Sequence, residues 1–224
     1  MSCELDHLVL AARTLGEGVA WCERTLGVTP SAGGRHALMG THNRVFSIAS
    51  DAFPRAYFEI IAIDPDAPDP GRARWFDLDD ARLQAAISHR PRLVHWVARC
   101  SDLDATLAAL ARRGIAAGRA LDASRATPAG ELRWRIAVPE DGGRRLRGAL
   151  PLLIEWGAMH PADNLAPCGV TLQSLALDAG GDDDDALRAL GLERYLREAG
   201  APLSATLASP RGTVALPSIE GLSP

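Results

Sequence analysis

Two histidines and two glutamates stand at corresponding points of an internal repeat, and their side chains are ligands that divalent transition metals prefer. His7 and His95 lie 88 residues apart, each in a short apolar segment. Glu59 and Glu155 lie in later apolar segments, where a carboxylate is costly to bury unless it is paired or bound to a cation. Two imidazoles and two carboxylates suit zinc, nickel, manganese or iron. The sequence therefore predicts one divalent metal site that these four residues share.

The segments that hold the two histidines open the two copies of the repeat. Residues 5–12 and 93–100 share the pattern Leu-x-His-x-Val, and their length and apolar composition predict two strands. Each strand leads into a predicted helix, because apolar residues recur at helical spacing and a glycine then ends the run. The positions concerned are Leu15, Val19, Cys22 and Gly27 in the first copy, and Leu103, Leu107, Leu110 and Gly114 in the second.

Further strand-like segments complete both copies. They are residues 43–48 and 57–63 in the first copy, and residues 132–138 and 150–156 in the second. Each copy is therefore interpreted as a βαβββ module that carries its histidine on the first strand and its glutamate on the last.

A third, shorter copy closes the chain. Residues 170–177 predict a strand, residues 182–193 a helix and residues 203–216 a hairpin. We expect this part to extend or cover an edge of the sheet. The predicted fold class is α+β, with two βαβββ modules and a C-terminal partial βαββ module. The predicted boundaries are 1–63 for the first module, 64–92 for a linker, 93–160 for the second module and 161–224 for the partial module.

Four motifs give the chain a resemblance to a known superfamily. They are Leu-Asp-His-Leu-Val at 5–9, Gly-Thr-His-Asn at 40–43, Tyr-Phe-Glu at 57–59 and Leu-Pro-Leu-Leu-Ile-Glu-Trp at 150–156. The chain resembles the vicinal oxygen chelate superfamily, which includes glyoxalase I, extradiol dioxygenases and bleomycin-resistance proteins, and is most similar to its glyoxalase-like domain proteins. The resemblance implies two curved sheets around a cleft that holds a metal. It also implies that His7, Glu59, His95 and Glu155 match the ligand pattern of glyoxalase I.

The expected chemistry follows from this ligand set. Two histidines and two carboxylates leave about two octahedral positions open, which suits a small substrate with adjacent oxygens. Glu59 or Glu155, released from the metal, would remove a proton next to a carbonyl group and give an enediolate-like intermediate. An isomerase or lyase is therefore favoured over a ring-cleaving dioxygenase. No glutathione site can be assigned.

A metal-free binding protein of the resistance type is the alternative function. Such a protein needs a large apolar cleft with aromatic walls, and aromatic residues make up only 5% of this chain. The low aromatic content disfavours the binding of a large planar compound.

Four polar side chains outside the proposed ligand set are candidates for substrate binding. The opposing interpretation of His42 and Asn43 is a turn whose side chains bond the local backbone. Arg147 could pair with a substrate carboxylate or phosphate. The opposing interpretation of Arg147 is a side chain on a solvated hairpin. The four candidates are His42, Asn43, Arg147 and His160.

Three aromatic or imidazole side chains near the proposed ligands are expected to lie elsewhere. Trp96 and Trp156 each follow a proposed ligand, and adjacent strand residues face opposite ways, so both should point away from the metal. His36 lies in an arginine-flanked segment without apolar periodicity and is expected to be solvated.

Composition excludes several classes of function. The formal net charge of −4 argues against nucleic acid as a partner. The absence of lysine excludes Schiff-base chemistry on a lysine side chain. We expect a cytoplasmic protein with no membrane segment, because no apolar run reaches about 18 residues and the N-terminus lacks signal-peptide character. A small-molecule substrate is the expected partner, and the resemblance favours a homodimer.

Overall fold

A computed structural model of the protein describes residues 2–127, 130–180, 184–197 and 200–219. The first half of the chain forms β1 (Glu4–Ala11), α1 (Leu15–Thr25), β2 (Ser31–His36), β3 (Thr41–Ser47) and β4 (Tyr57–Ile63). The second half forms α2 (Ala81–His89), β5 (Arg92–Arg99), α3 (Leu103–Ala111), β6 (Arg119–Thr127), β7 (Gly130–Val138) and β8 (Leu152–Trp156). The C-terminal part forms β9 (Thr171–Leu177), α4 (Asp184–Ala189), β10 (Leu203–Ser209) and β11 (Gly212–Pro217).

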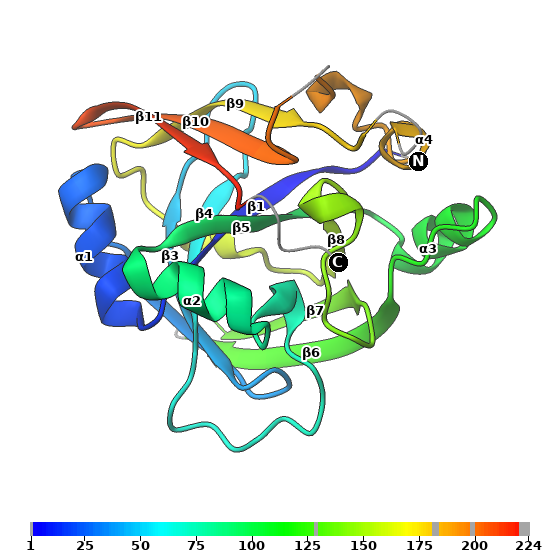
Figure 1. The fold of residues 1–224 in the computed structure, drawn as a ribbon, viewed down its shortest axis with the longest axis horizontal. Helices are drawn as coiled ribbons and strands as arrows, with labels where there is room; N and C mark the ends of the chain where they lie inside the picture. Colours follow the sequence, from blue (N-terminus) through cyan, green and yellow to red (C-terminus); the bar gives the residue numbers. More distant parts are fainter. Residues whose placement is uncertain (1, 128–129, 181–183, 198–199, 220–224) are drawn as a thin grey trace.

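One curved sheet of eight strands has the order β2-β3-β4-β1-β5-β8-β7-β6 (Figure 1). Its centre is the antiparallel pair of β1 and β5, in which His7 lies opposite Val97 and His95 lies opposite Val9. This reciprocal pairing shows that β1 and β5 are equivalent strands, as the repeat predicts. Strands β4 and β8 then run parallel to β1 and β5 on either side. The predicted α+β fold is confirmed.

A β-bulge interrupts each central strand directly before its histidine. The register between β1 and β5 skips Asp6, which lies between the paired residues Leu5 and His7. It also skips Val94, which lies between Leu93 and His95. A bulge re-aims the side chains around it, so the strict alternation of strand faces fails at these two points.

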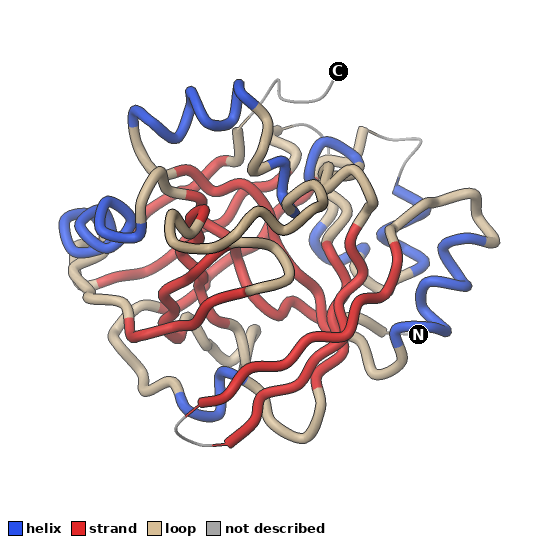
Figure 2. Tube along the Cα trace, turned by 90° about the horizontal axis from the view of Figure 1, so that it is seen from below, coloured by secondary structure: helices blue, strands red, loops and turns tan. Residues whose placement is uncertain are grey.

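The two faces of the large sheet pack into separate hydrophobic cores. On the outer face, Leu8, Leu10 and Trp96 share a buried cluster with Leu172 and Leu207 of the small β9–β11 sheet. Figure 1 shows this small sheet lying over β1 and β5, and Figure 2 shows the helices at the periphery of the strands. The expectation that the C-terminal part covers a sheet edge is therefore wrong, because the part packs on a face, which buries more apolar surface. The predicted module boundaries remain a prediction.

The two edges of the large sheet are β2 and β6, and neither strand was located in the sequence. Both lack a regular apolar alternation, since β2 reads Ser-Ala-Gly-Gly-Arg-His and β6 reads Arg-Ala-Leu-Asp-Ala-Ser-Arg-Ala-Thr. The helix predicted for residues 182–193 is observed at Asp184–Ala189, and its predicted start lies outside the described residues. Among the described residues, no helix is long and apolar enough to cross a membrane.

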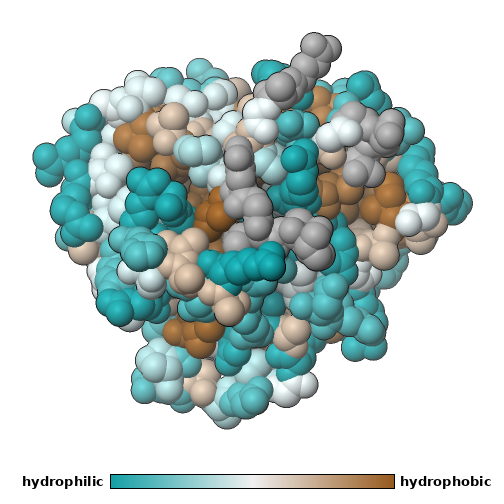
Figure 3. Space-filling model, in the orientation of Figure 1, coloured by the Kyte–Doolittle hydropathy of each residue, from teal (hydrophilic) through white to brown (hydrophobic). Residues whose placement is uncertain are grey.

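The surface is predominantly hydrophilic on the face that Figure 3 shows, with hydrophobic residues in separate patches. Leu38, at 38% exposure, is the only large hydrophobic residue in the described part of the chain that is exposed. The homodimer therefore stays a prediction.

Candidate functional site

His7 and Glu59 face one cavity on the inner side of the sheet. In the parallel pairing of β1 with β4, His7 lies beside Tyr57 and Val9 beside Glu59, so the odd-numbered residues of both strands share a face. The imidazole Nε2 of His7 lies 3.6 Å from Oε2 of Glu59. Two of the four proposed metal ligands are thus brought together.

Glu155 lies on the opposite face of the sheet from His7 and Glu59, so the structure does not bring this predicted ligand and catalytic residue to the cavity. In the pairing of β5 with β8, Val97 lies beside Leu152, so Leu152 takes the place that Glu59 has in the first half. Glu155 is three residues further on and points outward, where its Oε2 accepts a 2.8 Å hydrogen bond from the Leu103 amide at the start of α3. Arg135 lies 3.7 Å from the same oxygen.

His95 faces the inner side of the sheet but does not line the cavity. Its ring packs 5.4 Å from that of Phe76, and Phe76 forms the cavity wall instead. His95 is 0% exposed, and neither ring nitrogen has a hydrogen-bond partner of ordinary geometry among the described residues. Burial, together with the charge of Arg144, lowers the pKa of His95 well below its usual range, although the Gly148 backbone opposes this shift. His95 is therefore neutral.

Phe76 is held in place by a strained turn of the segment between β4 and α2. Its φ of 62° is a left-handed conformation that bulky side chains rarely adopt. The next residue, Asp77, accepts a 2.7 Å hydrogen bond from Nε of the buried Arg144. Arg144 also donates to the Val94 carbonyl at 3.0 Å. This clamp fixes Phe76 between the cavity and His95.

The predicted four-ligand metal site does not assemble. Within the ranges that the structure describes, no three histidine, cysteine, aspartate or glutamate side chains are grouped so that they could hold a metal ion. Glu155 is directed to α3, and His95 lies behind Phe76. The donor set therefore does not fit the group that the resemblance implies.

Asp6, the bulged residue of β1, sets the tautomer of His7. Its Oδ1 accepts a 2.7 Å hydrogen bond from His7 Nδ1, and its Oδ2 accepts from Trp156 Nε1 at 2.9 Å and His160 Nε2 at 2.8 Å. Burial alone would raise the pKa of Asp6, but the hydrogen bonds from His160 and His7 bring it below its usual range. An ionised Asp6 keeps the proton of His7 on Nδ1 and leaves Nε2 facing Glu59.

Asn43 fixes the other side of Glu59. Its Oδ1 accepts the backbone N–H of Gly34 at 2.7 Å, so its amide nitrogen faces the cavity and donates to Glu59 Oε1 at 2.6 Å. The same nitrogen lies 3.3 Å from His36 Nε2, which must therefore accept. His36 Nδ1 then donates to Thr41 Oγ1 at 3.1 Å. Burial lowers the pKa of His36 to about 4, so this imidazole is neutral.

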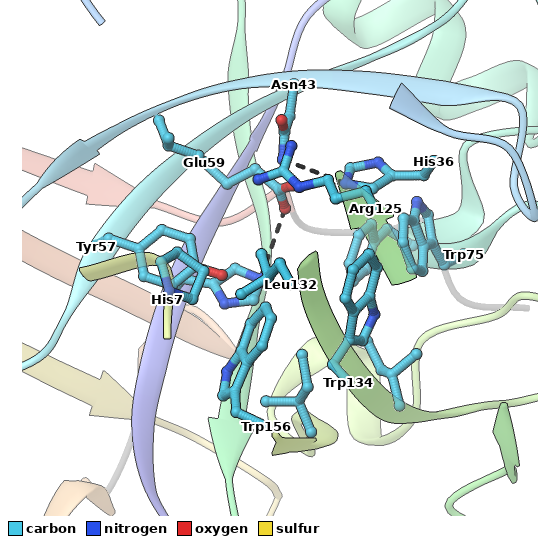
Figure 4. Close-up of a pocket in the computed structure, with 15 residues that line it drawn as sticks. His7, His36, Asn43, Tyr57, Glu59, Trp75, Arg125, Leu132, Trp134 and Trp156 are labelled. Carbon is cyan, nitrogen blue, oxygen red and sulfur yellow. Dashed lines mark hydrogen bonds and ion pairs between the residues drawn. The ribbon is translucent and has the colours of Figure 1, made fainter. Parts of the chain in front are cut away.

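Aromatic side chains surround the cavity (Figure 4), whose empty space is about 470 Å³ when the part open to solvent is included. Three of the five tryptophans line it. Tyr57 stacks on His7 with ring centroids 4.5 Å apart, and burial raises the pKa of the Tyr57 hydroxyl well above its usual range. We call this the inner cavity; its main lining residues are His7, His36, Asn43, Tyr57, Glu59, Trp75, Phe76, Arg125, Trp134 and Trp156.

The candidates for substrate binding separate into those at the cavity and those away from it. Asn43 lines the inner cavity, whereas His42 points to the other face of β3 and lies 3.8 Å from Asp64. Arg147 is half exposed and lies 3.8 Å from the carboxylate of Asp178, outside the cavity. His160 holds Asp6 rather than lining the inner cavity. The structure therefore places His42 and Arg147 away from the inner cavity.

The two tryptophans next to the proposed ligands behave differently. Trp96 points to the outer core, as predicted, and its indole donates to the Ala149 carbonyl at 3.0 Å. Trp156 lines the inner cavity, against prediction, because it pairs with the cavity residue Trp134 and takes the face that Glu155 was expected to have.

Three side chains of the inner site were missed in the sequence: Asp6, His36 and Arg125. Asp6 is a carboxylate inside an apolar strand, which could have marked it as a site residue. Regular strand alternation, however, would place Asp6 on the face opposite His7, and the sequence does not reveal the bulge. His36 and Arg125 lie on the edge strands that no apolar pattern revealed.

Comparison with known proteins places the chain in a family. The sequence profile of the Glyoxalase-like domain matches residues 5–193. The chain belongs to this glyoxalase-like domain family. The resemblance to the vicinal oxygen chelate superfamily is thereby confirmed at the level of the family. A search of curated protein sequences found no match.

Several solved structures are similar to this glyoxalase-like protein at low sequence identity. A hypothetical protein from Staphylococcus aureus is 12% identical, with 98% of this chain and 87% of that chain covered and a TM-score of 0.60. Methylmalonyl-CoA epimerase from Streptomyces coelicolor is 16% identical, with coverages of 71% and 100% and a TM-score of 0.42. The epimerase from Mycobacterium tuberculosis is 20% identical, with coverages of 73% and 89% and a TM-score of 0.41. At 12% identity the similarity to the Staphylococcus aureus protein shows the fold alone.

Proposed function

We propose that this glyoxalase-like protein is an isomerase or lyase that removes a proton from a carbon next to a carbonyl group, with Glu59 as the base. The observation that carries the proposal is the placement of Glu59, a buried carboxylate whose Oε1 is held by Asn43 and whose Oε2 faces the cavity and His7. A base needs one free oxygen in a position fixed by its neighbours. Glu59 meets that requirement.

The Asp6–His7 pair supplies the complementary proton donor. Asp6 holds the Nδ1 proton, so protons enter and leave His7 through Nε2, on the side of Glu59. In its imidazolium form His7 carries a second proton on Nε2. As Glu59 removes the carbon-bound proton, His7 gives this Nε2 proton to the carbonyl oxygen, which forms an enediol when the neighbouring carbon bears a hydroxyl. His7 then takes the hydroxyl proton, and Glu59 returns its proton to the other carbon. Every proton is accounted for, and no step passes through a metal.

The aromatic wall protects this chemistry from water. Tyr57, Trp134 and Trp156 surround the two reacting groups, and an enediol in such a cavity is shielded from hydrolysis and side reactions. The small volume favours substrates whose reacting part has few atoms, with oxygens on adjacent carbons.

Hydrogen–deuterium exchange tests the proposal directly. The purified protein is incubated in D2O with hydroxyacetone, acetoin or 2-oxobutanoate, and loss of the signal of the proton next to the carbonyl is followed by NMR. We expect catalysed exchange with at least one probe, and a loss of about 100-fold or more in Glu59→Gln.

Glu155→Gln is the matched control. The sequence predicts the same role for both glutamates, but Glu155 lies outside the cavity in the structure. A glutamine at position 155 can still accept the hydrogen bond from the Leu103 amide. Unchanged exchange in this variant supports the proposal. Equal losses in both variants, or exchange that survives Glu59→Gln, would overturn it.

Metal-free binding of a planar small molecule is the second candidate, and the concentration of tryptophans around the inner cavity favours it. Although aromatic residues are few, Trp75, Trp134 and Trp156 gather at one place. Tight binding of a planar compound, insensitive to a chelator and without exchange on any probe, would favour this candidate.

A further inference from the structure

Arg125 is a cation without a partner at the mouth of the inner cavity. It lies on β6, is half-buried, and makes no hydrogen bond or ion pair in the part of the chain that the structure describes. Among the described residues, no other arginine lines the inner cavity. A half-buried guanidinium has lost part of its hydration and gains from binding an anion.

The fold makes room for this guanidinium. Arg125 reaches from the edge strand β6 to the opposite edge strand β2, where a Cβ on Gly34 would lie 1.7 Å from Arg125 Nη1. Figure 4 shows the guanidinium among Glu59, Asn43 and His36. Its charge also acts on the site, because it opposes protonation of His36 and favours ionisation of Tyr57. Glycine at position 34 therefore permits a cation at this junction.

Arg125 also lines an outer groove, whose empty space is about 930 Å³ when the part open to solvent is included. The groove shares Val45, Arg125, Leu132 and Pro161 with the lining of the inner cavity, so the two spaces adjoin at Arg125. Beyond that point its walls are mostly apolar, with Met159 and Leu165 among them. A ligand that enters the inner cavity from the groove passes the cation.

A second donor without an acceptor lies in the wall of the same cavity. Trp75 is 5% exposed, and its indole nitrogen has no hydrogen-bond partner among the described residues. Buried donors normally have acceptors, so both this N–H and the guanidinium indicate that the ligand brings oxygen atoms.

We propose that the site binds a 2-oxo carboxylic acid with an apolar tail, its carboxylate on Arg125, its carbonyl carbon in the inner cavity and its tail in the outer groove. The orientation of this ligand, with its reacting carbon toward Glu59, rests on the proposed function. The binding of its carboxylate to Arg125 does not require that the protein catalyses a reaction. A carboxylate matches the planar fork of a guanidinium. A 2-oxo acid also has the adjacent oxygens and the acidic C3 proton that the chemistry of Glu59 requires.

Binding of 2-oxooctanoate, followed by quenching of intrinsic tryptophan fluorescence, tests the anion subsite. The three tryptophans of the inner cavity report on the ligand, and 2-oxooctanamide is the neutral analogue of equal length. We expect the carboxylate to bind at least about tenfold more tightly than the amide, and Arg125→Gln to remove this preference. Pyruvate, which lacks the tail, should bind more weakly than 2-oxooctanoate.

Arg133→Gln is the matched control, because Arg133 lies on the adjacent strand with its side chain 72% exposed. It should leave the preference unchanged, and Arg125→Lys should retain part of it. Equal affinity for carboxylate and amide in the wild type, or a preference that survives Arg125→Gln, overturns the inference. Competition by inorganic phosphate that is stronger than by acetate overturns the carboxylate class.

Exchange at C3 of 2-oxooctanoate in D2O separates this inference from the proposed function. Binding that depends on Arg125 without exchange on any probe contradicts the catalytic proposal and leaves the subsite standing. Exchange that depends on Glu59 but not on Arg125 contradicts the subsite and leaves the catalytic proposal standing.

Discussion

Asp6 and Val94 occupy equivalent positions, each as the bulged residue before the histidine of its central strand. In the first half the bulge supplies a carboxylate, which binds Nδ1 of His7 at 2.7 Å. In the second half it supplies an apolar side chain, and neither ring nitrogen of His95 has a hydrogen-bond partner of ordinary geometry among the described residues. The repeat therefore preserves the backbone of the two halves, while the polar network forms around the histidine of the first half alone.

Replacing His95 by leucine should leave activity intact and raise stability. Both ring nitrogens of His95 are buried without ordinary hydrogen bonds, so an apolar side chain of similar volume removes a desolvation cost of about 1–2 kcal/mol. Urea denaturation measures the stability, and exchange of the best carbonyl probe in D2O measures the activity. Loss of exchange without loss of folding would show that His95 works in the site, as the metal hypothesis requires.

Asp6→Asn should slow proton transfer, because the proton of His7 would no longer be held on Nδ1. Asparagine has about the same shape, but it offers one acceptor oxygen in place of the carboxylate that takes hydrogen bonds from His7, His160 and Trp156. We expect the exchange rate to fall by roughly 10- to 1,000-fold and its pH profile to change. A purely structural role would instead lower stability and leave the pH profile of the remaining activity unchanged.

The sequence predicted the parts of the fold that apolar periodicity marks. The equivalence of residues 5–12 with 93–100 followed from three shared residues and a repeated helical face, and it placed His7 at the centre of the sheet. Glu59 was identified because a carboxylate in an apolar strand has few stable environments. These inferences needed only residue types and spacing.

The face on which a strand residue points could not be obtained in the same way. Glu155 has the same surroundings in sequence as Glu59, yet pairing of Val97 with Leu152 turns it outward. A shift of one residue in the pairing register moves every side chain of a strand to the other face of the sheet. The residue types alone do not indicate the register or the position of a bulge. His36 and Arg125 were missed because edge strands bury one side only and carry little apolar pattern.

Gly33→Ala should disrupt the site through Asn43. A Cβ at position 33 would lie 2.1 Å from Oδ1 and 2.4 Å from the backbone oxygen of Asn43, and the backbone atom cannot move cheaply. We expect a loss of about 1–3 kcal/mol in stability and a strong loss of exchange, since Asn43 holds Glu59. Gly16→Ala, in α1, is the control, because a Cβ there would meet only Thr14 Oγ1 at 3.9 Å, and it should stabilise the protein by about 0.5–1 kcal/mol. Similar effects in both variants would contradict this account.

Stability should rise with pH between about 4 and 6.5, and His36 should be one cause. Burial lowers the pKa of His36 from 6.5 to about 4 in the folded protein, so the unfolded chain binds more protons within that window. The contribution of His36 is therefore complete above pH 6.5 and is lost as the pH falls toward 4; it amounts to roughly 3 kcal/mol at most.

His36→Gln removes this titration and keeps an amide that can bond Asn43 and Thr41. Urea denaturation between pH 4.5 and 7 should show a shallower dependence of the unfolding free energy on pH in the variant than in the wild type. His95 is also buried and neutral, so part of the slope should remain and should disappear in the double variant with His95→Leu. Parallel curves for the wild type and His36→Gln would mean that His36 is solvated, as its sequence context predicts, and that Asn43 binds Glu59 without the neutral imidazole.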